Sequence, residues 1–390
     1  MKQFPFLFFV VLVSVLVSSC TKDEIPSESS EDNVREKLIQ KQNDCVNILE
    51  IKQSSGSITI KFDDKSGVSF SSDNAVLYGI NEKGIWSKNG QETSVVVSKS
   101  SIDTFLSQFK VSGYFLMIIE GYTDWSFYFN DGLTVILKKE LFSIDADLIM
   151  RSINHRGYSN KVPENTLPAF RMSRLKGFKY VETDVRFTSD GVPVLLHDKT
   201  IDRTSNGTGD LSSYSFKQIR LFDFGGWKAK NYSGTLIPSL DEFLELCVDI
   251  GLEPNIELKE GTKEQIQGIV KRVEEYGLKD KTSYISFSLT YLKYVADYDP
   301  AARIGFITKT INNELLLRVS ALRTGLNDVY VGCSDYSPDA VMLCKNAGIP
   351  LNVWVLNTEK EILALPDYVS GVTSDLLHAG RVIYLSRNSK

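Results

Sequence analysis

Two histidines stand where they could exchange protons with a bound substrate. The chain of 390 residues holds three histidines, and two of them, His155 and His197, stand at the ends of predicted strands. Each is also followed by a charged residue, Arg156 in one case and Asp198 in the other. Imidazole is the side chain best suited to general acid–base catalysis near neutral pH, and a pair can deprotonate a nucleophile and protonate a leaving group. We therefore expect both histidines to be catalytic.

Acidic side chains recur with a spacing of two inside two further strand candidates. In the segment 180–185 this period places Glu182 and Asp184 on one face and the valines on the other. The segment with Glu257 and Lys259 repeats the arrangement. Charges that point into a protein interior are costly unless they are paired or bind a metal. A salt bridge of Glu257 with Lys259 would explain one acid but leave the other two without a partner.

Three carboxylates at converging strand ends predict a metal site made of oxygen ligands. Such a site favours Ca²⁺ or Mg²⁺ over zinc, so we expect one divalent cation at Glu182, Asp184 and Glu257. Arg156 and Lys259 add two cationic side chains nearby. A metal together with an arginine and a lysine suits an anion, and phosphate fits best. The sequence thus indicates chemistry on a phosphate ester.

From residue 146 to the end, strand and helix patterns alternate, which predicts a parallel sheet with helices packed on it. The length matches a TIM-type (β/α)8 barrel of about 250 residues, in which the carboxyl ends of the strands carry the catalytic groups. Nine strand candidates compete for eight places, and we expect Val329–Gly332 or Gly371–Thr373 not to be a full barrel strand. The candidates are 152–155, 180–187, 192–197, 253–259, 283–287, 303–307, 329–332, 352–356 and 371–373.

Three segments precede the barrel. Residues 1–20 combine a short apolar run with Val17-Ser18-Ser19-Cys20 and predict a lipoprotein signal peptide with Cys20 as the lipidated residue. Residues 21–42 are polar and predict a flexible tether. Residues 43–145 contain short β-type runs separated by turns and predict a small, antiparallel sandwich-like domain of unknown role. We expect export and a lipid anchor in a bacterial membrane, at the outer membrane or cell surface.

Composition excludes some partners. A net charge of −5 and the lack of a long basic run argue against nucleic acid. The five cysteines form no CxxC pair, which argues against a structural zinc site. We expect a small-molecule phosphodiester as the substrate and the membrane as the partner of the anchor.

A series of ordered motifs resembles the glycerophosphodiester phosphodiesterase family, within the phospholipase-C-like barrels. The matching segments are Asn154-His155-Arg156-Gly157, Pro163-Glu164-Asn165-Thr166, Glu182-Thr183-Asp184-Val185, His197-Asp198, Asp202-Arg203-Thr204, Asn255-Ile256-Glu257-Leu258-Lys259 and Ser286-Phe287. The resemblance is strongest over residues 150–260. It departs toward the end of the chain, where Trp354-Val355-Leu356-Asn357 and Ser374-Asp375 replace the family's usual Trp-Thr-Val-Asn and Thr-Asp.

The resemblance implies a role for each matching residue. Glu182, Asp184 and Glu257 would bind the metal, His155 and His197 would be acid and base, and Arg156 and Lys259 would hold the phosphate. Residues 199–239 correspond to an insertion over the barrel mouth that helps to form the substrate pocket. Glu164, Phe287 and Trp354 are further pocket candidates.

Other functions remain open from the sequence alone. A barrel of the same class could act on another phosphodiester, such as a lysophospholipid or a phosphoinositide-like compound. A carboxylate pair could also serve a glycoside hydrolase, but that reaction leaves the histidines, Arg156 and Lys259 without a role. A non-catalytic surface binding lipoprotein is a third possibility.

Overall fold

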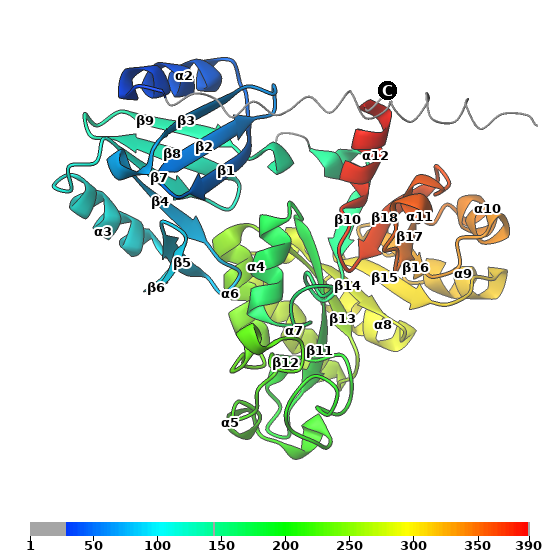
Figure 1. Ribbon diagram of the computed structural model, residues 1–390. Coiled ribbons are helices and arrows are strands. Elements are labelled where there is room, and N and C mark those ends of the chain that lie inside the picture. Colours follow the sequence, from blue (N-terminus) through cyan, green and yellow to red (C-terminus); the bar gives the residue numbers. More distant parts are fainter. Residues whose placement is uncertain (1–28, 143–144, 389–390) are drawn as a thin grey trace, which may run out of the picture.

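The computed structural model describes residues 29–142 and 145–388. Figure 1 shows a first domain of sheets and two helices, followed by a larger domain in which strands and helices alternate. The predicted signal peptide and Cys20 lie outside the described residues. Within the described ranges, no helix is both long enough and apolar enough to cross a bilayer.

The larger domain is a closed parallel barrel, as predicted. Each strand pairs in parallel with the next in sequence, and the first strand pairs with both the second and the last, which closes the cylinder. The eight strands are β10 (Arg151–Asn154), β11 (Tyr180–Phe187), β13 (Glu253–Leu258), β14 (Ser283–Ser286), β15 (Arg303–Thr308), β16 (Val329–Cys333), β17 (Leu351–Trp354) and β18 (Val369–Ser374). The fold is therefore a TIM-type (β/α)8 barrel.

The expectation about the surplus strand was wrong. Both suspected segments are barrel strands, β16 and β18, and the ninth strand is β12 (Pro193–Leu195). It pairs antiparallel with the end of β11, so it cannot take a place in the parallel cylinder. Because it runs back along β11, it carries the chain that follows it toward the interior of the barrel mouth.

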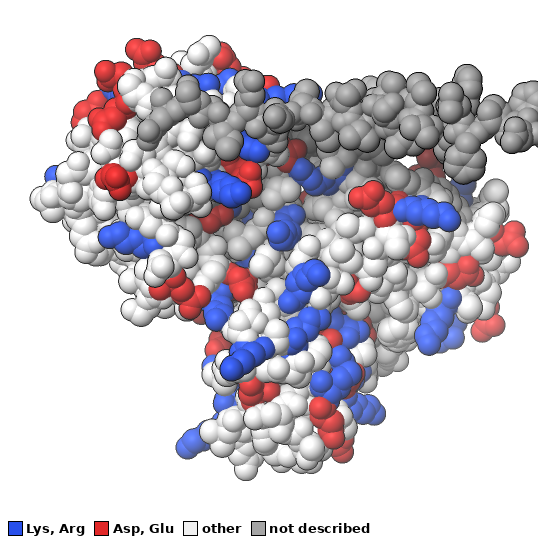
Figure 2. All heavy atoms as spheres, viewed as in Figure 1, with Lys and Arg blue, Asp and Glu red and all other residues white. Residues whose placement is uncertain are grey.

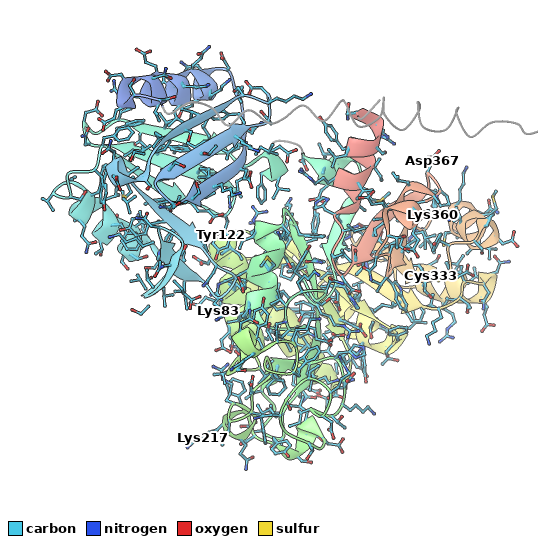
Figure 3. All side chains as sticks on the ribbon, viewed as in Figure 1. Lys83, Tyr122, Lys217, Cys333, Lys360 and Asp367 are labelled. Atoms are coloured by element: carbon cyan, nitrogen blue, oxygen red, sulfur yellow. The ribbon has the colours of Figure 1, made fainter. Side chains whose placement is uncertain are left out.

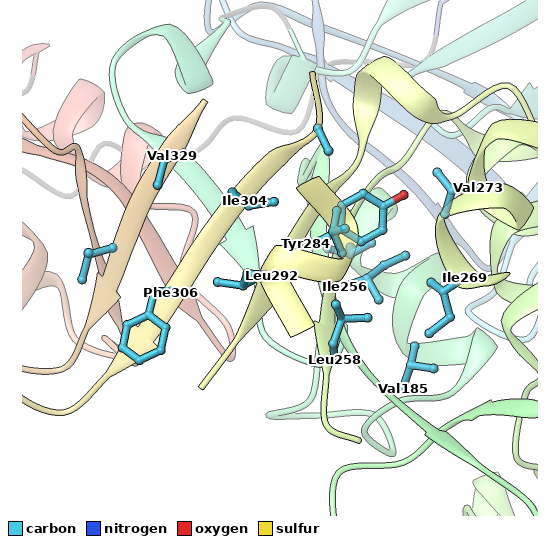
Figure 4. Close-up of a cluster of buried hydrophobic side chains, with 14 of the residues drawn as sticks. Val185, Ile256, Leu258, Ile269, Val273, Tyr284, Leu292, Ile304, Phe306 and Val329 are labelled. Atoms are coloured by element: carbon cyan, nitrogen blue, oxygen red, sulfur yellow. The ribbon is translucent and has the colours of Figure 1, made fainter. Parts of the chain in front are cut away.

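Helices cover the outside of the barrel and bury the apolar face of its strands. They are α4 (Leu167–Leu175), α6 (Leu240–Ile250), α7 (Lys263–Glu275), α8 (Leu289–Tyr298), α9 (Asn313–Ser320), α10 (Pro338–Ala347), α11 (Glu359–Leu363) and α12 (Ala379–Asn388). Figure 4 shows Val185 and Ile256 directed toward Ile269 and Val273 of α7. This packing fixes which strand residues point outward, so the alternate residues Glu182, Asp184 and Glu257 belong to the barrel interior.

The segment 199–239 forms the expected insertion at the barrel mouth. It contains short helical turns, η4 (Leu211–Ser213), α5 (Phe216–Ile219) and η5 (Lys230–Tyr232). Ile201, Leu211 and Phe224 are buried with Val194 and Leu196 in a small core of its own. Lys217, labelled in Figure 3, marks the tip of the insertion farthest from the first domain.

The first domain contains two sheets that share one core, as predicted for a sandwich. The smaller sheet is antiparallel and consists of β1 (Ile48–Ser54), β2 (Ser57–Phe62) and β3 (Gly67–Ser71). The larger has the order β6 (Gln91–Val96), β5 (Ile85–Lys88), β4 (Ala75–Ile80), β7 (Leu116–Glu120), β8 (Asp124–Phe129) and β9 (Thr134–Lys138). It is not wholly antiparallel, because β4 and β7 are parallel neighbours. Such a pair needs a crossover, and helix α3 (Lys99–Phe109) lies between them in the chain.

The prediction of a flexible tether over residues 21–42 was wrong for its second half. Residues Glu31–Asn43 form helix α2, and the side chain of Ser30 accepts a hydrogen bond from Asn33 at its start. Val34 and Leu38, four positions apart, are fully buried in the core of the first domain. Two apolar side chains in a polar segment were therefore enough to dock a helix.

Replacing Leu38 with alanine tests this packing. We expect the first domain to lose about 2–5 kcal/mol of stability, because a fully buried leucine leaves a cavity. Hydrogen exchange resolved by peptide should show faster exchange in α2 and its neighbouring strands. The exposed Glu36→Ala is the matched control, and equal exchange in the two variants would show that α2 contributes nothing to the core.

The two domains touch through specific side chains. Tyr122, which follows β7, packs against the barrel core, where the charge of Arg171 on α4 acts on it. Burial and the charge of Glu82 raise the pKa of Tyr232 in the insertion to about 12. Tyr122, labelled in Figure 3, lies where the first domain meets the barrel. On the face shown in Figure 2, acidic and basic side chains are interspersed over both domains. The first domain therefore contacts both the barrel wall and the insertion.

Candidate active site

Three carboxylates meet inside the barrel mouth, as the strand pattern predicted. Glu182 and Asp184 come from β11 and Glu257 from β13, and Asp184 and Glu257 are direct neighbours in the pairing of these strands. One oxygen from each of the three lies within 4.8 Å of the others. Their exposed fractions are 2%, 0% and 8% respectively. Three buried acids at this separation repel one another strongly unless cations lie between or beside them.

Burial and mutual repulsion change the acidity of this cluster. Burial and the charges of Asp184 and Glu257 raise the pKa of Glu182 well above its usual value. Burial and the charge of Asp184 raise the pKa of Glu257 to about 7. Burial acts in the same direction on Asp184, but Arg156 and Lys259 outweigh it and lower the pKa of Asp184 to about 2. The cluster therefore holds protons that a bound cation would displace.

Asp184 is held in place by the loop before α4. Asn165 donates a hydrogen bond from Nδ2 to Asp184 Oδ2 at 2.8 Å and accepts one from Thr183 Oγ1 at 2.8 Å. Thr166 caps the helix instead, accepting a hydrogen bond from the backbone N–H of Ala169. Of these two neighbouring residues, Thr166 therefore caps α4 and Asn165 orients Asp184.

Arg156 and Lys259 supply the predicted positive charge. Arg156 donates its backbone N–H to Glu182 Oε2 at 2.8 Å, and its Nε lies 3.4 Å from Asp184 Oδ2. Lys259 Nζ lies 2.6 Å from Glu257 Oε1 and 3.4 Å from Asp184 Oδ1. Both cations therefore border the acid cluster, where an anion could bridge them and a metal.

A tight turn brings Arg156 to this position. Arg156 and Gly157 both have a positive φ, of 55° and 77°. A Cβ at Gly157 would lie 2.7 Å from Cβ of Ala169 on α4. Only glycine tolerates both the left-handed conformation and this close approach to the helix, which explains the glycine two residues after His155.

His155 reaches the site from the end of β10. Its Nδ1 lies 2.7 Å from Asp375 Oδ1, and its Nε2 lies 4.0 Å from Glu182 Oε2. Asp375 also accepts hydrogen bonds from Ser159 and Asn357. Burial opposes its ionisation, but the hydrogen bond from His155 and these further contacts lower the pKa of Asp375 to about 2. The carboxylate thus fixes the ring and leaves Nε2 free for proton transfer.

His197 reaches the same cavity by another route. It follows β12, and the backbone N–H of Leu196 donates to the carbonyl oxygen of Asp184 at 3.0 Å, which brings the histidine beside the acid cluster. Its Nδ1 lies 2.6 Å from Asp198 Oδ1. Burial is the main cause that lowers the pKa of His197, against the opposing charge of Asp184. A neutral imidazole near pH 7 can accept a proton.

A cavity of about 110 Å³ unites these groups. Its charged side is formed by both histidines, Arg156, Lys259 and two of the acids, and its other side is largely apolar. Phe287 is half exposed and lies edge-on to Trp354, with ring centroids 6.0 Å apart. Ile285 and Ile307 also line the cavity. The arrangement fits a small molecule with an anionic centre and a less polar part.

Glu164 does not line this cavity, in contrast to the expectation. Its carboxylate accepts hydrogen bonds from Arg156 Nη1 at 2.9 Å and from Arg203 at 2.8 Å through each oxygen. Glu164 instead holds the side chain of Arg156.

Sequence reasoning did not select Asp375 or Asp198 as site residues, although both occur in the motifs quoted above. Asp375 is 220 positions from His155, so only the closed barrel brings the pair together. Asp198 is adjacent to His197 and could have been proposed as its partner from spacing alone. From the sequence, either Asn165 or Thr166 could equally be a helix N-cap or a functional group, and the structure gives the cap to Thr166.

The donor set suits a hard divalent cation. The ligand atoms are all carboxylate oxygens, and Oδ1 of Asp184 is buried without any hydrogen bond. Lys259 Nζ lies 3.4 Å from this oxygen without making a hydrogen bond to it, and a buried acceptor that lacks a hydrogen bond costs the desolvation of that oxygen. Carboxylate ligands select Ca²⁺ or Mg²⁺ over metals that prefer nitrogen or sulfur. The residues present therefore fit such an ion.

Comparison with known proteins agrees with this site. The model of the glycerophosphoryl diester phosphodiesterase family matches residues 155–377, which include all of the acidic and histidine residues above. A glycerophosphodiester phosphodiesterase of Caldanaerobacter subterraneus is 32% identical over 216 residues, covering 54% of this chain and 87% of its own. Human glycerophosphodiester phosphodiesterase 1 is 39% identical over 127 residues, covering 32% of this chain and 38% of its own.

A solved structure shows the same fold. A phosphodiesterase from Oleispira antarctica, in complex with the product sn-glycerol-3-phosphate, has 27% sequence identity and a TM-score of 0.56, and the match covers 62% of this chain and 98% of that one. More than a third of this chain lies outside the match. Because the family model covers more than half of the sequence, this chain belongs to the glycerophosphoryl diester phosphodiesterase family.

Proposed function

We propose that this protein hydrolyses glycerophosphodiesters to an alcohol and glycerol phosphate, using one divalent cation and two histidines. The observation that carries the proposal is the meeting of three buried carboxylates, two cations and two histidines at one cavity. A glycoside hydrolase would have no role for the two cations or the two histidines. The family membership and the glycerol phosphate bound to the Oleispira protein support the choice of substrate.

The chain's own cations would hold the phosphate. Arg156 and Lys259 both border the cavity and both face the acid cluster. In phosphoryl transfer most of the rate enhancement comes from positioning and from neutralising charge on the non-bridging oxygens. Glu182, Asp184 and Glu257 would hold Ca²⁺ or Mg²⁺, which when bound adds a further positive charge beside the phosphate.

The two histidines would move the protons. One takes a proton from the attacking water, a new P–O bond forms, and the bond between phosphorus and the oxygen of the leaving alcohol breaks, which yields the alcohol and glycerol phosphate. The other donates a proton to the departing alkoxide oxygen. Each ring is held by an aspartate at Nδ1, so that Nε2 is the exchanging nitrogen of both. Either ring can therefore accept or donate a proton through Nε2.

Metal affinity should depend on pH. Because burial raises the pKa of Glu257 to about 7, a proton competes with the cation below that pH. We expect the apparent affinity for Mg²⁺ or Ca²⁺ to fall at least about tenfold per pH unit between pH 7 and 5, because Glu182, whose pKa is also raised, adds a second competing proton. Calorimetry in buffers of different ionisation enthalpy measures both the affinity and the protons released. In Glu257→Gln the dependence should flatten, and an unchanged slope would show that another group titrates.

A panel of diesters tests the proposed substrate. Glycerophosphocholine, glycerophosphoethanolamine, glycerophosphoinositol, lysophosphatidylcholine and bis(p-nitrophenyl) phosphate are each incubated with Ca²⁺ or Mg²⁺. Glycerol phosphate is measured for the first three, choline for lysophosphatidylcholine and p-nitrophenol for the last. We expect the three glycerophosphodiesters to release glycerol phosphate. Turnover of lysophosphatidylcholine alone would favour the other phosphodiester class, and no hydrolysis of any member would contradict the proposal.

We also propose that the protein is exported and anchored by lipid on Cys20, at the outer membrane or cell surface. The support is the apolar run followed by Val17-Ser18-Ser19-Cys20. Acyl chains contribute about 0.8 kcal/mol per buried CH₂, so two or more of them retain a protein at a bilayer. Cys20→Ala should move the protein from the membrane fraction to the soluble one. Cys45→Ala, which changes an exposed cysteine of the first domain, is the control. Retention of the Cys20 variant in the membrane would contradict the anchor.

A further inference from the structure

One side chain of the insertion contacts both halves of the site. Arg203 donates from Nε to Asp198 Oδ2 at 2.6 Å, and from Nη1 and Nη2 to the two oxygens of Glu164 at 2.8 Å each. The pairing with Glu164 is bidentate, which is the strongest and most directional arrangement for a guanidinium and a carboxylate. A lysine could not reproduce it, because an ammonium cannot present two parallel donors and a third at the side.

Both carboxylates lead onward to residues of the cavity. The other oxygen of Asp198 lies 2.6 Å from Nδ1 of His197. Glu164 Oε1 also accepts a hydrogen bond from Nη1 of Arg156 at 2.9 Å. A continuous series of charged contacts therefore runs from His197 through Arg203 to Arg156. It joins a proposed catalytic histidine to the proposed phosphate-binding arginine.

Arg203 itself is outside the cavity. Its side chain is 44% exposed, and it is not among the residues that line the space shared by the histidines and acids. It therefore acts on the site only through its neighbours. The carboxylates that it holds are strongly ionised: burial opposes this, but Arg203 and its hydrogen bonds lower the pKa of Asp198 to about 2.

We propose that Arg203 is a positioning residue that sets the orientations of His197 and Arg156 together, so that the docked insertion completes the active site. This inference rests on the proposed hydrolysis. Without the guanidinium, Glu164 and Asp198 lose the cation between them, and each is free to leave the residue that it holds. His197 then loses its fixed Nδ1 contact and Arg156 its fixed Nη1 contact, although neither residue has been changed.

Arg220 provides a matched comparison. It also lies in the insertion, and its Nη1 donates to both oxygens of Glu242 on α6, at 3.0 and 2.8 Å, and to the carbonyl oxygen of Ile237. None of these partners lines the cavity. Loss of Arg220 therefore weakens the attachment of the insertion without touching the series from His197 to Arg156.

The test measures kcat and KM for glycerophosphocholine with the metal-loaded full chain. We expect Arg203→Ala to lower kcat/KM about 10–100-fold, the usual effect of losing a partner that orients a site residue. Asp198→Asn should lower mainly kcat, because it acts through His197, and Glu164→Gln should raise mainly KM, because it acts through Arg156. Arg220→Ala should stay within about twofold of the wild type.

Chemical rescue separates positioning from a general loss of structure. Because the Arg203 side chain is partly exposed, millimolar guanidinium can enter the space left in Arg203→Ala and bridge the same two carboxylates. We expect it to restore kcat/KM by at least about tenfold in that variant and to leave Arg220→Ala unchanged. Arg203→Lys should recover only part of the loss, since it can hold one carboxylate.

The possible outcomes distinguish failure of the inference about Arg203 from failure of the proposed hydrolysis. A wild-type value in Arg203→Ala, a loss that Arg220→Ala equals, or a loss that guanidinium does not relieve would each overturn the proposal. Absence of turnover in the wild type would instead count against the hydrolysis. In that case the affinity for sn-glycerol 3-phosphate, measured by calorimetry, still tests Arg203, because the variant should bind it about tenfold more weakly through Arg156. Equal affinity would overturn the proposal there too.

Discussion

Replacing His155 or His197 with alanine should lower the turnover number at least about 100-fold, because each removes one proton transfer of the reaction. The double variant should be little slower than either single one, since acid and base act on the same reaction and their effects do not add. Steady-state kinetics on glycerophosphocholine give these numbers. Thermal unfolding of the same samples shows whether the barrel is intact.

The third histidine is the matched control. His378 lies beside Phe178, with ring centroids 5.0 Å apart, and it does not line the cavity. Burial lowers the pKa of His378 to about 4, so it stays neutral at pH 7. His378→Asn should lose stability but keep kcat within about twofold. If His155→Ala or His197→Ala kept a near-normal turnover number, that histidine would not be part of the chemistry.

Changing Glu182 to glutamine should affect metal binding and stability in opposite directions. The variant loses a ligand charge, so its affinity for Ca²⁺ or Mg²⁺ should fall at least about 10-fold. It also loses a buried acid that repels two others, so the metal-free variant should unfold at a higher temperature than the metal-free wild type. Metal at 100 times the dissociation constant of the wild type should stabilise the wild type by about 2.7 kcal/mol. The same metal concentration should stabilise the variant by much less.

Glu253 controls for the loss of an acid from the neighbouring strand β13. It is the first residue of β13 and pairs with Lys179 at the opposite end of the barrel from Glu257. Glu253→Gln should leave both metal affinity and the metal-induced rise in unfolding temperature unchanged. Calorimetry and scanning fluorimetry measure the two quantities. An equal rise in the Glu182 and Glu253 variants would place the cation elsewhere.

Much of the barrel was predictable because its elements have strong local signals. Helix α6 is an example, since Ser239 and Glu242 form a capping box at its start and Gly251 ends it in a left-handed conformation. The surplus strand was not predictable. The residues of β12 are as apolar as those of a barrel strand, and only the antiparallel partner that they find in β11 distinguishes them.

The same division applies to the site. The period of two assigned Glu182, Asp184 and Glu257 to the interior, because that property is local to each strand. The register that places Asp184 beside Glu257, 73 positions away, is a property of the assembled sheet. Asp375 and Arg203 reach their partners only through barrel closure and the folding of the insertion. Both occur in the quoted motifs, but the motifs do not show which residues they contact.

The most direct test of the account is the turnover of glycerophosphocholine by one preparation before chelation, after chelation and after one equivalent of Ca²⁺ or Mg²⁺ per chain is returned. The central claim is that three buried acids hold one cation that the reaction needs. It predicts a loss of at least about 100-fold on chelation and recovery at a stoichiometry of one. A preparation shown to be free of metal that hydrolyses the diester at its original rate would contradict it.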